Sequence, residues 1–293
     1  MNRVAVIGLA GQSAFMGVER FHTGGETIVA KDFHLEFGGK GFNQAVAAAR
    51  HGARVSFLGA IGERDFDDLS SLCQKESIKP FLAKKDCPSP YASIITDESG
   101  ETHVTVAPGD ALLDSMDLDV FKDEIAKCDV LLLTNETPQK VNEEAIAWAK
   151  KCGAYVILNP APYRDLSGFI LRETDLFTPN ESENRGLEAA KETIVTLGKM
   201  GCRLGSSGRR YGAKNFGKAI DATGAGDTFN GVLAAMLARK EKLDAAIEAA
   251  LEAAGKSVTK RYVLNAIPYL RPAANGAPEG SVGGRGGASL GLV

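Results

Sequence analysis

Short apolar runs alternate with amphipathic segments along most of the chain. The runs typical of strands buried in a parallel sheet are Arg3–Leu9, Val55–Ala60, Val130–Leu133, Tyr155–Leu158, Asp175–Phe177 and Thr193–Leu197. The segments that favour helices are Asn43–His51, Phe66–Gln74, Pro138–Lys151, Ala225–Arg239 and Leu243–Gly255. This alternation predicts an α/β fold with a doubly wound, mostly parallel sheet flanked by helices, and with ligands at the carboxyl ends of its strands.

Two stretches, Glu26–Phe37 and Tyr91–Val106, depart from this alternation. They hold β-branched and aromatic residues in partly alternating order, with Gly and Pro at their flanks, which is typical of antiparallel strands outside the main sheet. We expect a small β lid over the active site, built from about residues 12–37 and 90–107. Exposed strand edges invite pairing, so a homodimer through this lid is a reasonable hypothesis.

The length of the chain, 293 residues, suits one large α/β domain with a small appendage. We place this domain at residues 1–270. Residues 271–293 are rich in Gly, Ala, Pro and Ser and lack apolar periodicity, so we expect a disordered tail there.

Charge and cysteine content exclude several classes of protein. A formal net charge of -3 gives no electrostatic footprint for nucleic acid or an anionic membrane. The apolar run near the N-terminus is too short for a transmembrane helix. The five cysteines are widely spread and never spaced as C-x-x-C, which argues against a disulfide framework and a zinc site. We therefore expect a cytoplasmic protein with a small-molecule substrate.

The segment DATGAGDTFNG at residues 221–231 places glycines directly before an apolar helix. Gly224 and Gly226 allow the backbone to approach a phosphate, and the helix start presents unpaired N–H groups and a positive dipole end. Asp227 beside them suits a base that accepts the proton of an attacking hydroxyl in phosphoryl transfer. The alternative, about equally favoured for a single turn of this kind, is that Asp227 caps the helix.

A second glycine-rich segment, FGGKGFN at residues 37–43, also precedes a helix. Because Gly41 follows Lys40, the segment is not a Walker A loop, which needs Ser or Thr at that position. Backbone N–H groups, Lys40 and the Asn43 amide could hold the hydroxyls of a polar substrate. The alternative is a plain turn with a solvated lysine.

Two further strand ends could bind a nucleotide. Asn180 and Glu183 follow a predicted strand, and their oxygens suit a hydrated Mg²⁺ that bridges phosphates, although this spacing by itself favours a helix cap. The turn TLGKMG at residues 196–201 could accept a phosphate or a ribose on its backbone. The alternative for this turn is an ordinary junction between a strand and a loop.

Taken in this order, these segments resemble the ribokinase-like (PfkB) sugar kinase family. GGKGFNQAVAAARHGA at residues 38–53 is similar to the first family signature, and DATGAGDTFNG is similar to the second. LNPAP at 158–162, TPNESE at 178–183 and TLGKMG also match, so the resemblance covers about residues 4–268. It implies an α/β core with a β lid, and phosphorylation of a sugar hydroxyl with ATP and Mg²⁺.

The resemblance also implies roles for individual residues. Asp227 would be the catalytic base, and the anion hole would be formed by Gly224, Ala225 and Gly226. The substrate would be bound by Gly39, Lys40, Asn43, Glu136 and Asp227. The nucleotide site would be lined by Asn180, Thr196, Gly198, Gly201 and Gly226. Glu183 would act on Mg²⁺ through water, and a monovalent cation such as K⁺ would be bound by Asp221 and the carbonyl of Thr223.

Some positions depart from the family pattern. Family members usually carry Asn and Asp after the first strand, whereas an ungapped comparison places Gly11 and Ser13 there. Losing a carboxylate that accepts sugar hydroxyls favours another polyol, a nucleoside or another ring substrate over ribose, with Ser13 in the substrate site. The chain between Glu183 and Thr196 is shorter than in the family, and residues 260–266 replace a Gly-Ala turn and Ser that often help to bind the cation.

The leading interpretation is an ATP-dependent sugar kinase. The alternatives are a nucleoside or pseudouridine-type kinase of the same family and a catalytically weak sugar-binding homologue, which the shortened segment and the tail would favour. A dinucleotide-binding oxidoreductase is disfavoured because it needs G-x-G-x-x-G after the first strand, and GLAGQS at residues 8–13 does not supply it.

Overall fold

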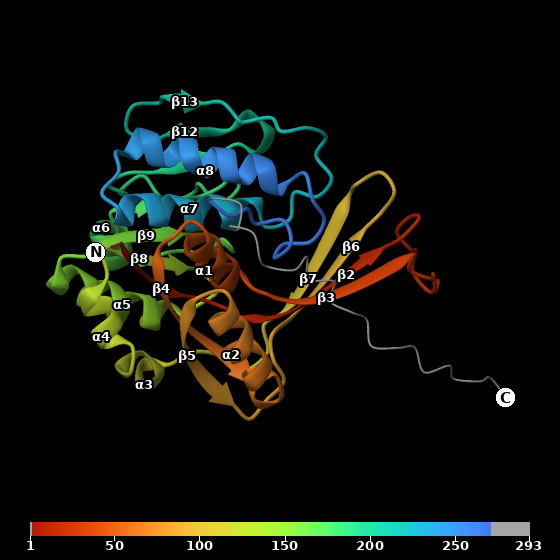
Figure 1. Ribbon diagram of the computed structural model, residues 1–293, viewed down its shortest axis with the longest axis horizontal. Helices are drawn as coiled ribbons and strands as arrows, with labels where there is room; N and C mark the ends of the chain where they lie inside the picture. The colour runs from red at the N-terminus through yellow and green to blue at the C-terminus, as the bar shows by residue number, and fades with distance from the viewer. Residues whose placement is uncertain (1, 271–293) are drawn as a thin grey trace.

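The computed structural model describes residues 2–270, so the tail expected at 271–293 lies outside the described residues. Its central sheet has six strands in the order β10-β9-β8-β1-β4-β5, and every pair is parallel (Figure 1). The strands are β1 (Arg3–Ile7), β4 (Arg54–Gly62), β5 (Ile78–Lys85), β8 (Val130–Thr134), β9 (Tyr155–Asn159) and β10 (Leu176–Phe177). The predicted parallel α/β sheet is confirmed, with β5 as an additional edge strand.

Helices cover both faces of this sheet. On one face lie α1 (Lys40–Arg50), α2 (Phe66–Lys75), α7 (Ala225–Ala238) and α8 (Leu243–Ser257), and on the other lie α3 (Ser115–Asp119), α4 (Lys122–Lys127), α5 (Gln139–Cys152) and α6 (Gly168–Glu173). Strand β1 shows why its sequence is continuously apolar: Val4 and Val6 pack in one core, and Ala5 and Ile7 pack in the other. None of the helices within residues 2–270 has both the length and the apolar character needed to cross a membrane.

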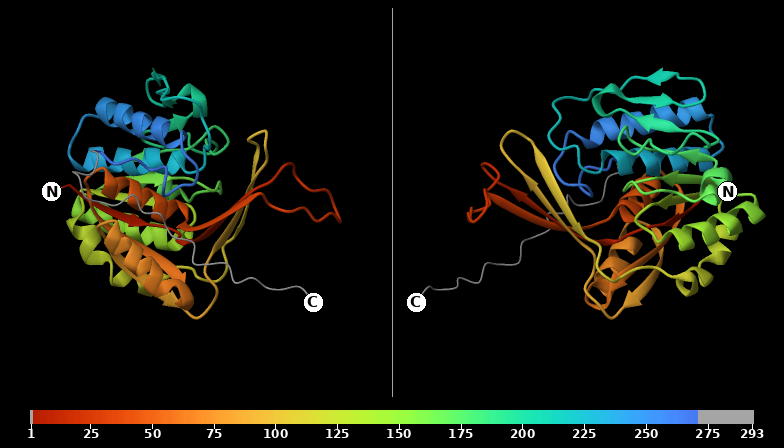
Figure 2. Two further views of the ribbon diagram at one scale, coloured as in Figure 1. Left: turned by 45° about the vertical axis from the view of Figure 1, so that its right-hand side comes forward. Right: turned by 180° about the vertical axis from the view of Figure 1, so that it is seen from behind.

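A four-stranded sheet, here called the lid sheet, projects from the core (Figure 2). It consists of β3 (Asp32–Gly38), β2 (Gly11–Gly17), β6 (Tyr91–Thr96) and β7 (Thr102–Ala107), in that order. The predicted small β sheet is confirmed, but the strand expected from Glu26 begins only at Asp32. The outer pairs are antiparallel, whereas β2 and β6 are parallel, because both strands leave the same edge of the core after β1 and β5.

The two faces of the lid sheet have different surroundings. On the inner face, the His34 ring stacks on Tyr262 with 3.9 Å between ring centroids, and Glu36 accepts hydrogen bonds from the backbone N–H groups of Val263 at 2.8 Å and Leu264 at 3.2 Å. Strand alternation turns Phe33 to the outer face, where it is 64% exposed. The base of the lid sheet is therefore fixed to the C-terminal loop of the core.

A third, antiparallel sheet corrects one expectation. Residues 193–197 were expected to continue the main sheet, but β11 (Ile194–Thr196) pairs with β12 (Cys202–Leu204), which pairs with β13 (Arg210–Tyr211). The expectation is nevertheless met in part, because parallel bridges join Phe177 to Thr193 and Asn180 to Thr196 beside β10. Hydrogen bonds from Phe177 N–H to the Glu192 carbonyl at 3.0 Å and from Thr196 N–H to the Pro179 carbonyl at 2.8 Å support this connection. No helix lies between Glu183 and Ile194, and this short connection leaves room only for turns and a loop. The turn at η2 (Gly198–Met200) follows β11, and η1 (Glu63–Asp65) precedes α2.

Candidate active site

The glycine-rich segment at residues 37–43 packs directly on the carboxyl end of β1. Gly39 has φ 98°, and a Cβ there would lie 2.5 Å from the Leu9 carbonyl oxygen. A Cβ on Gly41 would lie 2.5 Å from the Gly8 Cα, so only glycine permits this approach of the two backbones. The segment therefore begins α1 at the edge of the sheet where ligands of α/β proteins bind.

Asp227 lies in the first turn of α7 and is 7% exposed. Its two carboxylate oxygens accept hydrogen bonds from Asn43 Nδ2 at 2.9 Å and from Gln44 Nε2 at 3.1 Å. Gly224 occupies the N-cap position with φ 75°, and no side chain caps the helix. The capping interpretation of Asp227 is therefore wrong, since its carboxylate is turned toward α1.

The start of α7 leaves backbone donors open beside Asp227. Within residues 2–270, the N–H groups of Gly226 and Asp227 have no backbone acceptor, whereas Ala225 N–H donates to the Ala222 carbonyl at 3.2 Å. A Cβ on Gly226 would meet nothing within 4 Å, while a Cβ on Gly224 would lie 2.5 Å from Val263 Cγ1. The anion hole stays a prediction, and these donors with the positive end of the helix dipole support it.

Lys40 and Glu136 form the charged wall of the site. Lys40 N–H donates to Glu136 Oε2 at 2.9 Å, which brings the end of β8 against the start of α1. Burial raises the pKa of Glu136 to about 8, so this carboxyl group is mostly protonated at neutral pH. The charge of Asp227 raises the pKa of Lys40, whose ammonium group stays charged. The free site therefore offers a cation and a carboxylic acid near the base.

Two site residues were missed in the sequence. Gln44 is fully buried, and its Nε2 bridges Asp227 Oδ1 and Asn159 Oδ1, the latter at 3.2 Å. Asn159 in turn donates to the carbonyl of Thr178 at 2.8 Å, just before the predicted nucleotide residues. A signal was present, since an amide stands beside the small apolar face of α1 and another ends the buried strand β9.

Ser13 lies on β2, is buried, and stands opposite Glu36 on the lid sheet. A Cβ on Gly38 would collide with Ser13 Oγ and would lie 3.9 Å from Asn43 Oδ1, so Ser13 is close to Asn43. Gly11 has no room for a side chain, because a Cβ there would collide with the carbonyl of Pro90. The two positions that depart from the family pattern thus differ: Ser13 borders the substrate residues and Gly11 is blocked.

The predicted nucleotide residues gather at the ends of β10 and β11. Asn180 N–H donates to Glu183 Oε2, and Glu183 N–H donates to Asn180 Oδ1, each at 2.9 Å. This is the reciprocal geometry of a capping box, but no helix follows it. Asn180 also bridges to Thr196, and the exposed turn with Gly198 and Gly201 continues from there. The structure therefore brings Asn180, Glu183, Thr196, Gly198 and Gly201 into one region. Gly226, the remaining predicted nucleotide residue, lies in the first turn of α7.

The predicted cation residues lie in the loop before α7. The Asp221 carboxylate accepts hydrogen bonds from Thr223 N–H at 2.9 Å and Tyr262 N–H at 3.2 Å. Within residues 2–270, no three His, Cys, Asp or Glu side chains gather into a metal site.

Comparisons with known proteins place the chain in a family. The family described as pfkB family carbohydrate kinase matches residues 1–269. The ribokinase of Haemophilus influenzae is 33% identical, with 90% of this chain and 95% of the ribokinase covered, and the ribokinase of Bacillus subtilis is 31% identical, with 88% and 93% covered. The ribokinase structure from Giardia lamblia superposes with a TM-score of 0.81 at 26% identity, covering 91% of this chain and 96% of that one.

Proposed function

The chain belongs to the pfkB family of carbohydrate kinases, which are ATP-dependent, and we propose that its acceptor is a hydroxyl group held between Asp227 and the lid sheet. One observation carries this proposal. Asp227 is buried, its carboxylate is oriented by two amide donors, and open backbone N–H groups lie beside it. A base next to an anion hole is the arrangement that phosphoryl transfer to an alcohol requires.

Each group has a distinct part in the proposed reaction. Asp227 accepts the proton of the attacking hydroxyl, and the N–H groups of Gly226 and Asp227 stabilise the oxygens of the transferring phosphoryl group. The charged Lys40 lies close enough to Asp227 for their charges to interact, and it offsets the negative charge that gathers there. Mg²⁺, held through water near Glu183, would neutralise phosphate charge when bound with ATP. Asn43 and Gln44 hold the carboxylate of Asp227 in position, and this positioning supplies the remaining part of the rate enhancement.

The substrate pocket favours an acceptor other than ribose. Ser13 stands where family members usually carry a carboxylate, and a Cβ on Gly11, where they usually carry Asn, would collide with the carbonyl of Pro90. Glu136 compensates in part, because its protonated carboxyl group can donate a hydrogen bond to a substrate oxygen. This combination of donors suits a sugar with fewer or differently placed hydroxyls, or a nucleoside with a carbonyl on its ring.

The experiment measures ADP release from Mg·ATP with a panel of pentoses, deoxypentoses, hexoses and nucleosides, including pseudouridine. We expect one acceptor to give saturable turnover and ribose to have a lower kcat/KM. Running each reaction with and without K⁺ tests the proposed cation site at Asp221 and Thr223. Turnover with none of these acceptors, combined with ligand-dependent thermal stabilisation, would favour the sugar-binding homologue and reject the kinase proposal.

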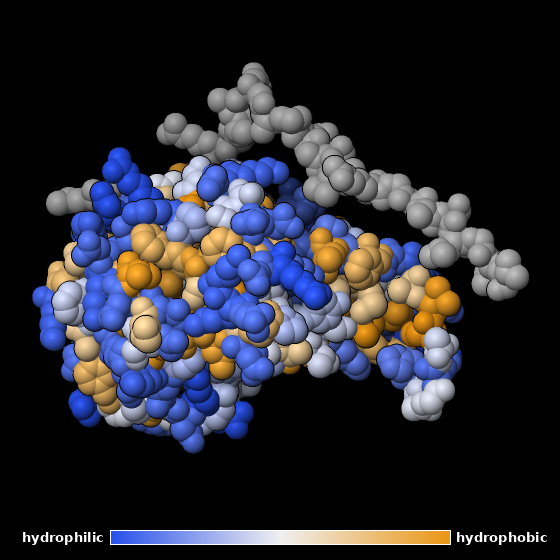
Figure 3. Space-filling view, turned by 90° about the horizontal axis from the view of Figure 1, so that it is seen from below, coloured by the Kyte–Doolittle hydropathy of each residue, from blue (hydrophilic) through white to orange (hydrophobic). Residues whose placement is uncertain are grey.

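The lid sheet supports a second proposal, a homodimer. Apolar side chains lie exposed on the lid sheet (Figure 3). Phe33 and Leu35 lie on its outer face with exposed fractions of 64% and 47%, and the register puts Val104 and Val106, with 54% and 50%, on the other face of its edge strand β7. Apolar surface of this kind on a projecting sheet marks an interaction surface.

The five free cysteines and the absence of a spanning helix within residues 2–270 support a cytoplasmic location, which we also propose.

A further inference from the structure

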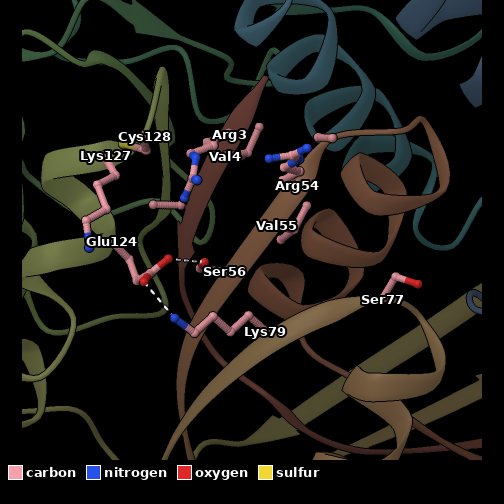
Figure 4. Close-up of a pocket in the computed structure, with 12 residues that line it drawn as sticks. Arg3, Val4, Arg54, Val55, Ser56, Ser77, Lys79, Glu124, Lys127 and Cys128 are labelled. Atoms are coloured by element: carbon pink, nitrogen blue, oxygen red, sulfur yellow. Dashed lines mark hydrogen bonds and ion pairs between the residues drawn. The ribbon is translucent and has the colours of Figure 1, made fainter. Parts of the chain in front are cut away.

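A cavity lies at the edge of the central sheet opposite the catalytic residues. Its volume is about 570 Å³, and it is lined by the first residues of β1 and β4, by β5 and by the end of α4 (Figure 4). The proposed active site lies at the carboxyl ends of the same strands, so the two sites are separated by the length of β1. Volumes of 300–1,000 Å³ are typical of pockets for small molecules.

The lining of this cavity is strongly cationic. It carries the four basic side chains of Arg3, Arg54, Lys79 and Lys127 and one acidic side chain, Glu124, which gives a local formal charge of four minus one, or +3. The whole chain has a formal charge of -3, so the positive charge of this cavity is opposite in sign to the net charge of the protein. A concave surface lined by one sign of charge focuses the field and attracts counter-ions.

The single carboxylate is already occupied by neighbours. Glu124 accepts hydrogen bonds from Ser56 Oγ at 2.6 Å and from Lys79 Nζ at 2.8 Å. Figure 4 shows both contacts on one side of the cavity. Lys127 has only a long contact of 4.0 Å with Asp123, and both side chains are more than half exposed. Glu124 therefore neutralises one of the four cations and leaves the others available.

The two arginines are the unusual part of the cavity. Arg3 and Arg54 are partners in the register of β1 and β4, so two guanidinium groups start from adjacent positions of neighbouring strands. No side chain or carbonyl within residues 2–270 pairs with either guanidinium group. Like charges side by side on a sheet are destabilising, and a bound anion would offset this pair.

We propose that this cavity binds a small molecule through a phosphate group carrying two or more negative charges. The planar guanidinium groups of Arg3 and Arg54 match the oxygens of a phosphate, and Lys127 adds a point charge from α4. Ser77 adds a hydroxyl group to the lining, whereas the hydroxyl of Ser56 already donates to Glu124. The cavity is separate from the catalytic residues, so this proposal does not depend on the proposed kinase reaction.

The test is isothermal titration calorimetry with inorganic pyrophosphate as the probe, with and without Mg·AMP-PNP to occupy the ATP site. The proteins compared are the wild type, Arg3→Gln/Arg54→Gln, and the control Arg210→Gln/Lys242→Gln. The control removes the same charge from two exposed positions outside the cavity. A thermal melt of each protein establishes that it is folded.

The expected result is one pyrophosphate site that persists beside the ATP analogue in the wild type and the control. In Arg3→Gln/Arg54→Gln, the affinity of that site should fall at least tenfold, which corresponds to about 1.4 kcal/mol. Should that variant fail to fold, Arg54→Gln/Lys127→Gln replaces it, since both positions are exposed. Equal binding by all folded proteins, absence of binding to the wild type at millimolar pyrophosphate, or binding fully displaced by the ATP analogue would overturn the proposal.

Discussion

Gln44→Met should separate orientation of the catalytic base from stability of the core. Gln44 is fully buried, and its amide donates to both Asp227 and Asn159. Methionine has nearly the same volume and flexibility but cannot donate, so the substitution removes the two hydrogen bonds with little change in packing. Asp227 would keep only the hydrogen bond from Asn43.

The size of the effect follows from the charge of the acceptor. A hydrogen bond to a charged group contributes about 1.5–3 kcal/mol, and if this energy orients the base in the transition state, kcat/KM falls about 10- to 150-fold. ADP release measured over a range of acceptor concentrations gives kcat/KM.

A control distinguishes orientation from general destabilisation. Ile247→Val shortens a fully buried side chain of α8 and should cost about 0.5–1.5 kcal/mol in the free energy of unfolding, with kcat/KM unchanged. If Gln44→Met keeps kcat/KM within twofold of the wild type, Gln44 does not orient the base.

Three further predictions concern the site wall, the lid sheet and the C-terminal loop. Burial raises the pKa of Glu136 from 4.5 to about 8, so the folded protein binds a proton that the unfolded chain releases between these values. The free energy of unfolding should therefore fall as pH rises from about 5 to 8. Glu136→Gln should flatten this pH dependence in urea unfolding, and an unchanged pH dependence would contradict the assignment. Phe33→Lys should shift sedimentation toward the monomer, and a wild type that is already monomeric at high concentration would reject the dimer. Arg50→Met should lower the free energy of unfolding by about 3–5 kcal/mol, because it leaves the buried partner Glu76 unpaired and removes donors to the loop at residues 264–267. A decrease below 1 kcal/mol in urea unfolding would show that the pair is dispensable.

The sequence predicts the parallel sheet well because its strands are buried on both faces. Each residue of β1 from Val4 to Ile7 contributes to one of two cores, so the whole run must be apolar. Strand β5 was missed because it lies at the edge, where only its first residue is fully buried and lysines and a proline are tolerated. Helices α3, α4 and α6 have only five or six residues, too few for a helical period to stand out.

The candidate site was predictable where glycines and charged residues share a motif. Asp227, Asn43 and Lys40 stand in the two glycine-rich segments, and the structure brings them together. Gln44 directly follows Asn43 in the same motif, but its partner Asp227 is 183 positions away, so the only local signal was its place beside the small apolar face of α1. The prediction for β11 was right only in part, because its residues bridge in parallel to the β10 side but form their ladder with β12.

The most direct test of the proposed mechanism is Asp227→Asn, assayed for ADP release with the best acceptor and for acceptor binding by calorimetry. The amide keeps the size of the carboxylate but cannot accept the hydroxyl proton, and general-base catalysis contributes about 10²–10⁴-fold. We predict a loss of kcat in this range with the dissociation constant of the acceptor nearly unchanged. Turnover within tenfold of the wild type would contradict the assignment of Asp227 as the base.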